Sequence, residues 1–192
     1  MPKNRLEAFS DGVLAIVITI MVLELKVPHG KSELVDLLPI WPIFLGYLLS
    51  FIYVAIYWNN HHHLLQVVKQ VNGPILWANM HLLFWLSLLP FATSWMGDNP
   101  MAQMPVALYG FILLMAGLAY YILTKTLLSH HGDQSELARA IGNDFKGKIS
   151  IIVYAFALPI SFFYPLLAII AYFLVALLWL VPDKRMEKVL KS

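Results

Sequence analysis

Long apolar stretches separated by short polar segments dominate the hydropathy pattern of the chain. The hydrocarbon core of a bilayer is about 30 Å thick, and a helix needs roughly 20 apolar residues to cross it. The last apolar stretch, 149–181, is too long for one crossing, and Pro159 and Pro165 allow the chain to turn near its centre. The pattern therefore predicts an all-α polytopic membrane protein in which residues 1–192 form a single domain of six spans, at about 5–25, 37–61, 74–95, 105–127, 148–163 and 166–182.

The placement of basic residues predicts the orientation of these spans. With the N-terminus in the cytoplasm, the outer loops contain only Lys26 and Lys31 of the 13 lysines and arginines. Cytoplasmic loops of membrane proteins carry such an excess of positive charge. Merging the last two spans would put the basic C-terminal segment outside. We therefore expect both termini in the cytoplasm.

Composition supports the membrane class and excludes several kinds of chemistry. Hydrophobic residues make up 60% of the chain, charged residues 12%, and the mean hydropathy is +0.72, whereas soluble domains are about 25% charged. Lipid must cover much of this apolar surface. The chain has no cysteine, which excludes disulfides and thiolate sites. No Gly-rich phosphate loop or facing pair of carboxylates occurs. We expect no enzyme activity, no catalytic residue, no cofactor and no nucleic-acid partner.

Polar side chains gather at the beginning of the first span, in the order Arg5, Glu7, Ser10, Asp11. Charges within a spanning helix are costly and usually mark function. An interfacial position explains Glu7, because acids are favoured near a helix N-terminus. It explains Asp11 poorly, because Asp11 lies roughly two turns into the helix.

Three consecutive histidines, 61–63, stand at the end of the second span. Metal ligands on a helix need a shared face, whereas adjacent residues diverge by about 100°. His81 is a further candidate ligand, but no carboxylate accompanies it at metal spacing. We predict no metal site, although a histidine-based metal site stays open as an alternative. A secondary transporter is a second alternative function. The spans argue against it, because they show no inverted halves and no broken helix with a polar site at mid-depth.

The motif Arg5-x-x-x-Phe9-Ser10-Asp11 resembles the signature of the endosomal and lysosomal potassium channel family (transmembrane protein 175) and its prokaryotic relatives. The span layout, the loop charges and the cluster Trp58-Asn-Asn60-His-His62-His63 fit this family as well. The resemblance implies a K⁺-over-Na⁺ cation channel that also passes Cs⁺ and Rb⁺. Animal members carry two six-helix repeats; one repeat implies a homotetramer in a bilayer, which we expect to be the bacterial plasma (inner) membrane.

The same resemblance implies that the first span lines the pore. At about 100° per residue, one face of that span carries Ile16, Thr19, Ile20 and Leu23. In relatives, the residue five after the motif aspartate forms a hydrophobic constriction, here Ile16, and the residue eight after it influences ion preference, here Thr19. The chain has no Thr-Val-Gly-Tyr-Gly filter, so selectivity would come from side chains.

Asp11 lies about 140° from Ile16 on the helical wheel, so we expect it to face neighbouring helices rather than the ion path. The resemblance implies that Ser10 and Asp11 form a polar network with Trp58, Asn60 and one or more histidines. We favour His62 and His81 as those partners, and the choice among the histidines stays open.

Overall fold

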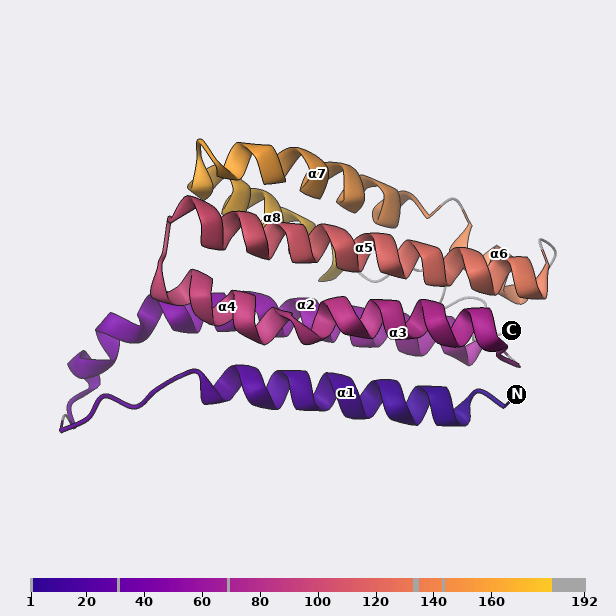
Figure 1. Cartoon of the computed structure of the whole chain (residues 1–192), viewed down its shortest axis with the longest axis horizontal. Coiled ribbons are helices and arrows are strands. Elements are labelled where there is room, and N and C mark those ends of the chain that lie inside the picture. Colours follow the sequence, from indigo (N-terminus) through magenta and orange to yellow (C-terminus); the bar gives the residue numbers. More distant parts are fainter. Residues whose placement is uncertain (1, 31, 69, 133–134, 143, 181–192) are drawn as a thin grey trace.

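The computed structural model describes residues 2–30, 32–68, 70–132, 135–142 and 144–180. Over these residues the chain forms eight α-helices and one 3₁₀ helix (Figure 1), which confirms the all-α fold class. In chain order they are α1 (Asn4–Leu23), η1 (Leu34–Ile40), α2 (Trp41–Gln66), α3 (Gly73–Ser87), α4 (Leu89–Asp98), α5 (Gln103–His131), α6 (Glu136–Ile141), α7 (Phe145–Ser161) and α8 (Pro165–Leu180).

Four stretches of the described chain are long and apolar enough to cross a membrane. They are α1, the continuous stretch Leu34–Gln66, the stretch Gly73–Asp98 and α5. Helices α7 and α8 have 17 and 16 residues, which corresponds to about 24–26 Å at 1.5 Å per residue. Crossing by α7 and α8, and with it the count of six, stays a prediction. Residues 181 and 182 of the last expected span lie outside the described residues.

Prolines change the boundaries of two expected spans. Pro39 lies within η1 and Pro42 occupies the first turn of α2, so the α-helix begins at Trp41 rather than at 37. It continues to Gln66, which places all three histidines inside α2. The expected helix 74–95 is interrupted at Leu88, because Pro90 in the first turn of α4 lacks an N–H and its ring would clash with a preceding carbonyl. Residues 74–95 therefore form two helices within one apolar stretch.

Helix α1 lies along one edge of the bundle and α7 along the opposite edge, with α5 between them (Figure 1). Helix α1 packs against α2, α3 and α4, while α7 packs against α5 and α8. The N-terminus of α1 and the C-terminus of α2 lie at the same end of the bundle, and we call this the N-terminal end. One side of α1 thus faces the subunit and the other side faces away from it.

Hydrogen bonds between buried hydroxyls join the helices in the interior. The Ser50 hydroxyl of α2 lies 2.7 Å from that of Thr93 and 2.9 Å from that of Tyr109. The Tyr172 hydroxyl of α8 donates to the main-chain carbonyl of Val106, at 3.3 Å. A Cβ at Gly110 would lie only 1.9 Å from that hydroxyl, so this close approach of α5 and α8 requires glycine.

Candidate functional site

Helix α1 has two faces of different character. Its buried side chains follow helical spacing and pack against α2, α3 and α4: Leu6, Ser10, Leu14, Val17 and Met21. Gly12, Ala15, Ile16, Thr19, Ile20 and Leu23 are exposed. Ile16 is 59% exposed and Leu23 is 72% exposed. The four residues predicted to line a pore therefore all point away from the helices of their own subunit.

The Thr19 hydroxyl lies on the exposed face and donates to the main-chain carbonyl of Ala15, at 2.8 Å. This bond to the preceding turn occupies its proton. The oxygen keeps lone pairs that can accept a hydrogen bond or contact a cation. Thr19 is the polar member of the exposed set formed with Ile16, Ile20 and Leu23.

Three buried polar side chains, joined by hydrogen bonds, attach the opposite face of α1 to α2 and α3. The Asn79 amide on α3 donates to Ser10 Oγ at 3.0 Å, and Ser10 donates to the Leu6 main-chain carbonyl at 2.8 Å. His61 Nε2 lies 2.8 Å from Asn79 Oδ1. Because that amide oxygen can only accept, His61 carries its proton on Nε2. Each of the three side chains is buried and hydrogen-bonded, so this series of hydrogen bonds links α1, α2 and α3.

Asp11 belongs to a separate contact with α2. The Trp58 indole N–H donates to Asp11 Oδ1 at 2.9 Å, and both residues are exposed in the single chain. The His62 ring stacks on Trp58 with centroids 5.7 Å apart. Asp11 therefore contacts a neighbouring helix through Trp58, while Ser10 enters the core.

The two histidines favoured from the sequence occupy other positions. His62 bonds Gln66, at 2.8 Å, and His81 accepts from the Trp85 indole, at 3.0 Å. The buried partners of Ser10 are instead Asn79 and, beyond it, His61, which is 2% exposed. Helical spacing carried a signal for this pairing, because His61 follows Trp58 by three residues and shares its side of α2.

The remaining residues of the expected network lie apart from Ser10. The Asn60 amide donates to the Ile56 carbonyl at 2.7 Å, and the main-chain carbonyl of Asn60 accepts from Tyr120 on α5, at 3.3 Å. Arg5 and Phe9 are exposed. Asn60 therefore contacts α5 rather than α1.

Lys3 and Glu24 make contacts at the two ends of α1 that the sequence did not indicate. Lys3 Nζ donates to the Leu65 carbonyl at 2.5 Å and to the Gln66 carbonyl at 3.1 Å. A cation there satisfies carbonyls left free at the end of α2 and complements its dipole. At the far end, the Ser94 hydroxyl donates to Glu24 Oε2 at 2.9 Å. Helix α1 is thus held at its middle and at both ends.

Nothing in this arrangement resembles a catalytic or metal centre. Within the ranges that the structure describes, no three His, Cys, Asp or Glu side chains gather closely enough to hold a metal ion. The geometry instead combines a firmly attached helix with an unpartnered face of apolar, small and hydroxyl side chains.

Two comparisons with known proteins identify the family. A model of the family described as "Endosomal/lysosomal potassium channel TMEM175" matches residues 5–90. A protein of Chryseobacterium sp. (strain P1-3), named a potassium channel, is 62% identical over 192 residues and is covered completely, as is this chain. This chain belongs to the TMEM175 family.

Membership in the TMEM175 family confirms the resemblance drawn from the Arg5-to-Asp11 motif. TMEM175 proteins are channels, so the chain is an integral membrane channel protein and not an enzyme. The segment matched by the TMEM175 model, 5–90, contains all of α1 except Asn4 and all of α2 and α3, and hence both the exposed face and the buried network.

Structural comparison extends the TMEM175 likeness to nearly the whole chain. The crystal structure of a lysosomal potassium-selective channel TMEM175 homolog from Chamaesiphon minutus superposes with a TM-score of 0.81 at 30% identity, covering 93% of this chain and 96% of that one. The bovine endosomal/lysosomal proton channel TMEM175 is 29% identical over 157 residues, which are 74% of this chain and 33% of the bovine protein.

Proposed function

We propose that this chain is the subunit of a homotetrameric, K⁺-over-Na⁺-selective channel, in which four copies of α1 surround a central pore. The observation that carries the proposal is the unpartnered face of α1, with Ile16, Thr19, Ile20 and Leu23 directed away from the subunit. Relatives named potassium channels support the choice of K⁺ as the permeant ion. Cs⁺ and Rb⁺, which are also weakly hydrated, would pass as well.

The composition of that face supports a pore or subunit contact rather than lipid contact. Gly12, Ala15 and Thr19 alternate with larger residues, and small residues let neighbouring helices approach closely in membranes. Apart from its chain neighbours and the backbone of α1 itself, a Cβ at Gly12 would meet no atom within 4 Å in the single subunit. That empty surface is available to a neighbouring copy of α1.

Ile16 would form the narrowest part of the pore. Four isoleucine side chains at one level offer no oxygen to an ion, so passage there depends on wetting of a hydrophobic neck. An entering ion must strain or lose part of its hydration shell without replacement ligands. K⁺ holds water less tightly than Na⁺ and would lose less. Leu23 and Ile20 would continue the apolar wall toward the far end.

The contacts behind α1 would fix its rotation about its own axis. The Asn79 amide reaches Ser10 on the buried face, and Trp58 holds Asp11 at the flank. Together with the contacts of Lys3 at the near end, they oppose rotation of α1 and keep Ile16 outward. Ser10 and Asp11 would therefore support the pore without lining it.

The membrane topology of the proposed channel has six crossings, with α7 and α8 as the last two and both termini in the cytoplasm. The basic residues of the inner loops support this orientation. Relatives in Chryseobacterium and Chamaesiphon support a bacterial plasma membrane.

Flux from liposomes tests the proposal. Purified protein reconstituted with K⁺, Na⁺ or Cs⁺ inside should release K⁺ and Cs⁺ faster than Na⁺, down a gradient and without a counter-substrate. Its mass in detergent should be four times that of the 21.8 kDa chain. A conducting monomer or dimer would refute the arrangement of four α1 helices, and flux that requires exchange would indicate a transporter.

A further inference from the structure

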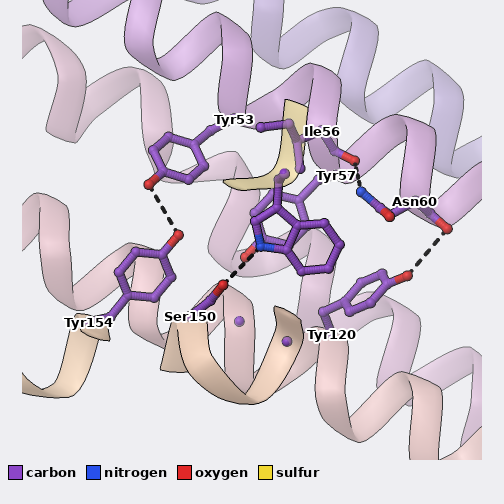
Figure 2. Close-up of a pocket in the computed structure, with 10 residues that line it drawn as sticks. Tyr53, Ile56, Tyr57, Asn60, Tyr120, Ser150 and Tyr154 are labelled. Carbon is purple, nitrogen blue, oxygen red and sulfur yellow. Dashed lines mark hydrogen bonds between the residues drawn. The ribbon is translucent and has the colours of Figure 1, made fainter. Parts of the chain in front are cut away.

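Two hollows of the subunit differ in the use of their polar groups. One lies between α2, α5, α7 and α8 and has mostly aromatic walls (Figure 2). Its polar groups bond one another across the helices: Tyr154 donates to the Tyr53 hydroxyl at 3.1 Å, and the Trp179 indole donates to Ser150 at 2.9 Å. These hydrogen bonds stabilise the packing of the helices.

The other hollow lies at the N-terminal end of the bundle, where α3 begins and α5 ends. It measures about 420 Å³ and is open on one side, so a ligand as large as a lipid headgroup can enter. We call it the α3–α5 hollow. Its lining contains no acidic residue and consists of Asn72, Pro74, Lys125, Thr126, Ser129 and His130.

Lys125 gives the α3–α5 hollow a positive charge. Its Nζ lies over the Tyr121 ring, 5.5 Å from the centroid, and this cation–π contact orients the side chain without neutralising it. Among the described residues, no carboxylate oxygen lies within 4 Å of Lys125 Nζ. Burial raises the pKa of the Asp144 carboxyl, and Lys125 opposes that rise only from beyond ion-pair distance. The charge of Lys125 is therefore available to a ligand.

His130 presents a hydrogen-bond donor whose position follows from its neighbours. The Ile75 main-chain N–H donates to Asn72 Oδ1 at 3.1 Å, which fixes the orientation of that amide. The Asn72 amide N–H then donates to His130 Nδ1, at 3.1 Å. Because Nδ1 accepts, the neutral ring carries its proton on Nε2. Within the described ranges, neither His130 Nε2 nor the Ser129 hydroxyl is bonded to a protein group.

Exposed apolar side chains begin one turn from the α3–α5 hollow, toward the middle of the bundle. Trp77 follows Pro74 by three residues and is 78% exposed, and Ile122 precedes Lys125 by three and is 44% exposed. Tryptophan and tyrosine gather where the headgroup region meets the hydrocarbon. Trp77 and Tyr121 therefore place the hollow at the level of the headgroups.

We propose that the α3–α5 hollow binds the phosphate group of an anionic phospholipid. The Lys125 ammonium pairs with the phosphate, and the Ser129 hydroxyl and His130 Nε2–H donate to its oxygens. The acyl chains lie along Trp77 and Ile122. Free inorganic phosphate has the same charged group but cannot make the apolar contacts. Lipid binding here requires neither a tetramer nor a pore.

Native mass spectrometry of the purified, delipidated chain in detergent tests the site. Phosphatidylglycerol should bind more tightly than phosphatidylcholine with the same acyl chains, whose headgroup has no net charge. Lys125→Gln should raise the dissociation constant of phosphatidylglycerol about fivefold, the loss expected for one cation near an anionic lipid. Lys125→Arg should restore binding, and Ser129→Ala should weaken it about twofold.

Arg139→Gln is the matched control, because Arg139 is an exposed cation of α6 at the same end of the bundle and does not line the hollow (Figure 1). It should leave the dissociation constant of phosphatidylglycerol unchanged. An equal loss in Arg139→Gln and Lys125→Gln, or equal binding of the two lipids to wild type, would overturn the site. Complete displacement of phosphatidylglycerol by an equal concentration of inorganic phosphate would show that the ligand is free phosphate and overturn the lipid assignment.

The melting temperature gives an independent measurement, because a ligand that binds the folded state stabilises it. Phosphatidylglycerol should raise the melting temperature of wild type and Arg139→Gln more than that of Lys125→Gln. An equal rise in all three proteins would also overturn the proposal.

Discussion

Two surfaces of the subunit are exposed and largely apolar in the single chain, yet they differ in composition. The outer face of α8 consists of large side chains, among them Leu166, Ile170, Phe173, Leu174 and Leu177. The outer face of α1 alternates large residues with Gly12, Ala15 and Thr19. Large apolar side chains suit lipid, whereas small and hydroxyl residues suit contact between helices or with water. Exposure alone thus does not distinguish a lipid-facing helix from one that faces a pore, but side-chain size and polarity do.

The buried sides of the two helices differ as well. Helix α8 packs through Ala168, Tyr172, Val175 and Ala176, and its Tyr172 hydroxyl reaches α5. Helix α1 is held by side chains that accept and donate in sequence from α2 to α3 to Ser10. Such a network fixes rotation more strictly than apolar packing, because each of its hydrogen bonds requires a particular donor and acceptor in a fixed geometry. In the proposed tetramer the outer face of α1 would meet three copies of itself, and that arrangement requires such precision.

The largest expected effect comes from placing the same polar substitution on each face. Ile16→Asn should hydrate the neck, raise K⁺ conductance and reduce the K⁺ over Na⁺ preference while the tetramer stays intact. A barrier lower by about 1.4 kcal/mol would raise conductance about tenfold. Single-channel recording and Na⁺ flux measure both changes.

Leu174→Asn on α8 is the control for Ile16→Asn. It should leave conductance and ion preference unchanged and lower only the yield of inserted protein, because an amide facing lipid is costly. If Ile16→Asn instead destabilises the protein and Leu174→Asn alters conductance, the two faces have been assigned the wrong way round. An intact Ile16→Asn tetramer with wild-type currents would refute the constriction.

The second prediction concerns the buried hydrogen bonds that attach α1 to its neighbours, and it leaves the outer face of α1 unchanged. Asn79→Ala leaves His61 without its partner and removes the donor to Ser10, which keeps its bond to the Leu6 carbonyl, and an unsatisfied buried group costs about 1–3 kcal/mol. Thermal stability and the fraction of tetramer in detergent should fall, while the protein that still assembles keeps its ion preference. Ser10→Ala should act in the same direction and more weakly.

Ser87→Ala on the same helix serves as the reference for Asn79→Ala. Ser87 is exposed and bonds only the Phe84 carbonyl, at 2.8 Å, so its loss should change stability by no more than about 0.5 kcal/mol. A change of ion preference in Asn79→Ala at unchanged stability would mean that the network lies in the ion path.

Sequence patterns predicted the apolar helices and the outward face of α1, because lipid imposes long apolar stretches and a helix repeats every 3.6 residues. They did not predict the interruption at Leu88. The sequence contains Pro90, but a proline can either bend a spanning helix or divide it. Helical spacing places His61 on the same side of α2 as Trp58, but the selection of His61 over His62 and His81 also depends on how α2 and α3 are rotated against each other. That rotation is set by packing between residues distant in sequence, which periodicity within one helix does not contain.

The smallest expected effect, and the most specific, concerns Thr19. Valine has nearly the shape of threonine and Thr19 is exposed, so Thr19→Val should leave assembly unchanged while it removes a ring of four oxygens beside the neck. The hydroxyl proton is bonded to Ala15, which directs oxygen lone pairs away from the helix, where they can replace part of the water around K⁺. A weak ligand worth about 0.5–1 kcal/mol changes a permeability ratio about two- to fivefold. The K⁺ to Na⁺ ratio from reversal potentials should therefore fall by that factor in Thr19→Val and recover in Thr19→Ser. Thr126→Val is the matched control, since Thr126 is partly exposed on α5 and bonds the carbonyl four residues before it, at 2.8 Å, as Thr19 does. If both valine variants shift the ratio equally, or neither does, the contribution of Thr19 to selectivity is refuted while the constriction at Ile16 is untouched.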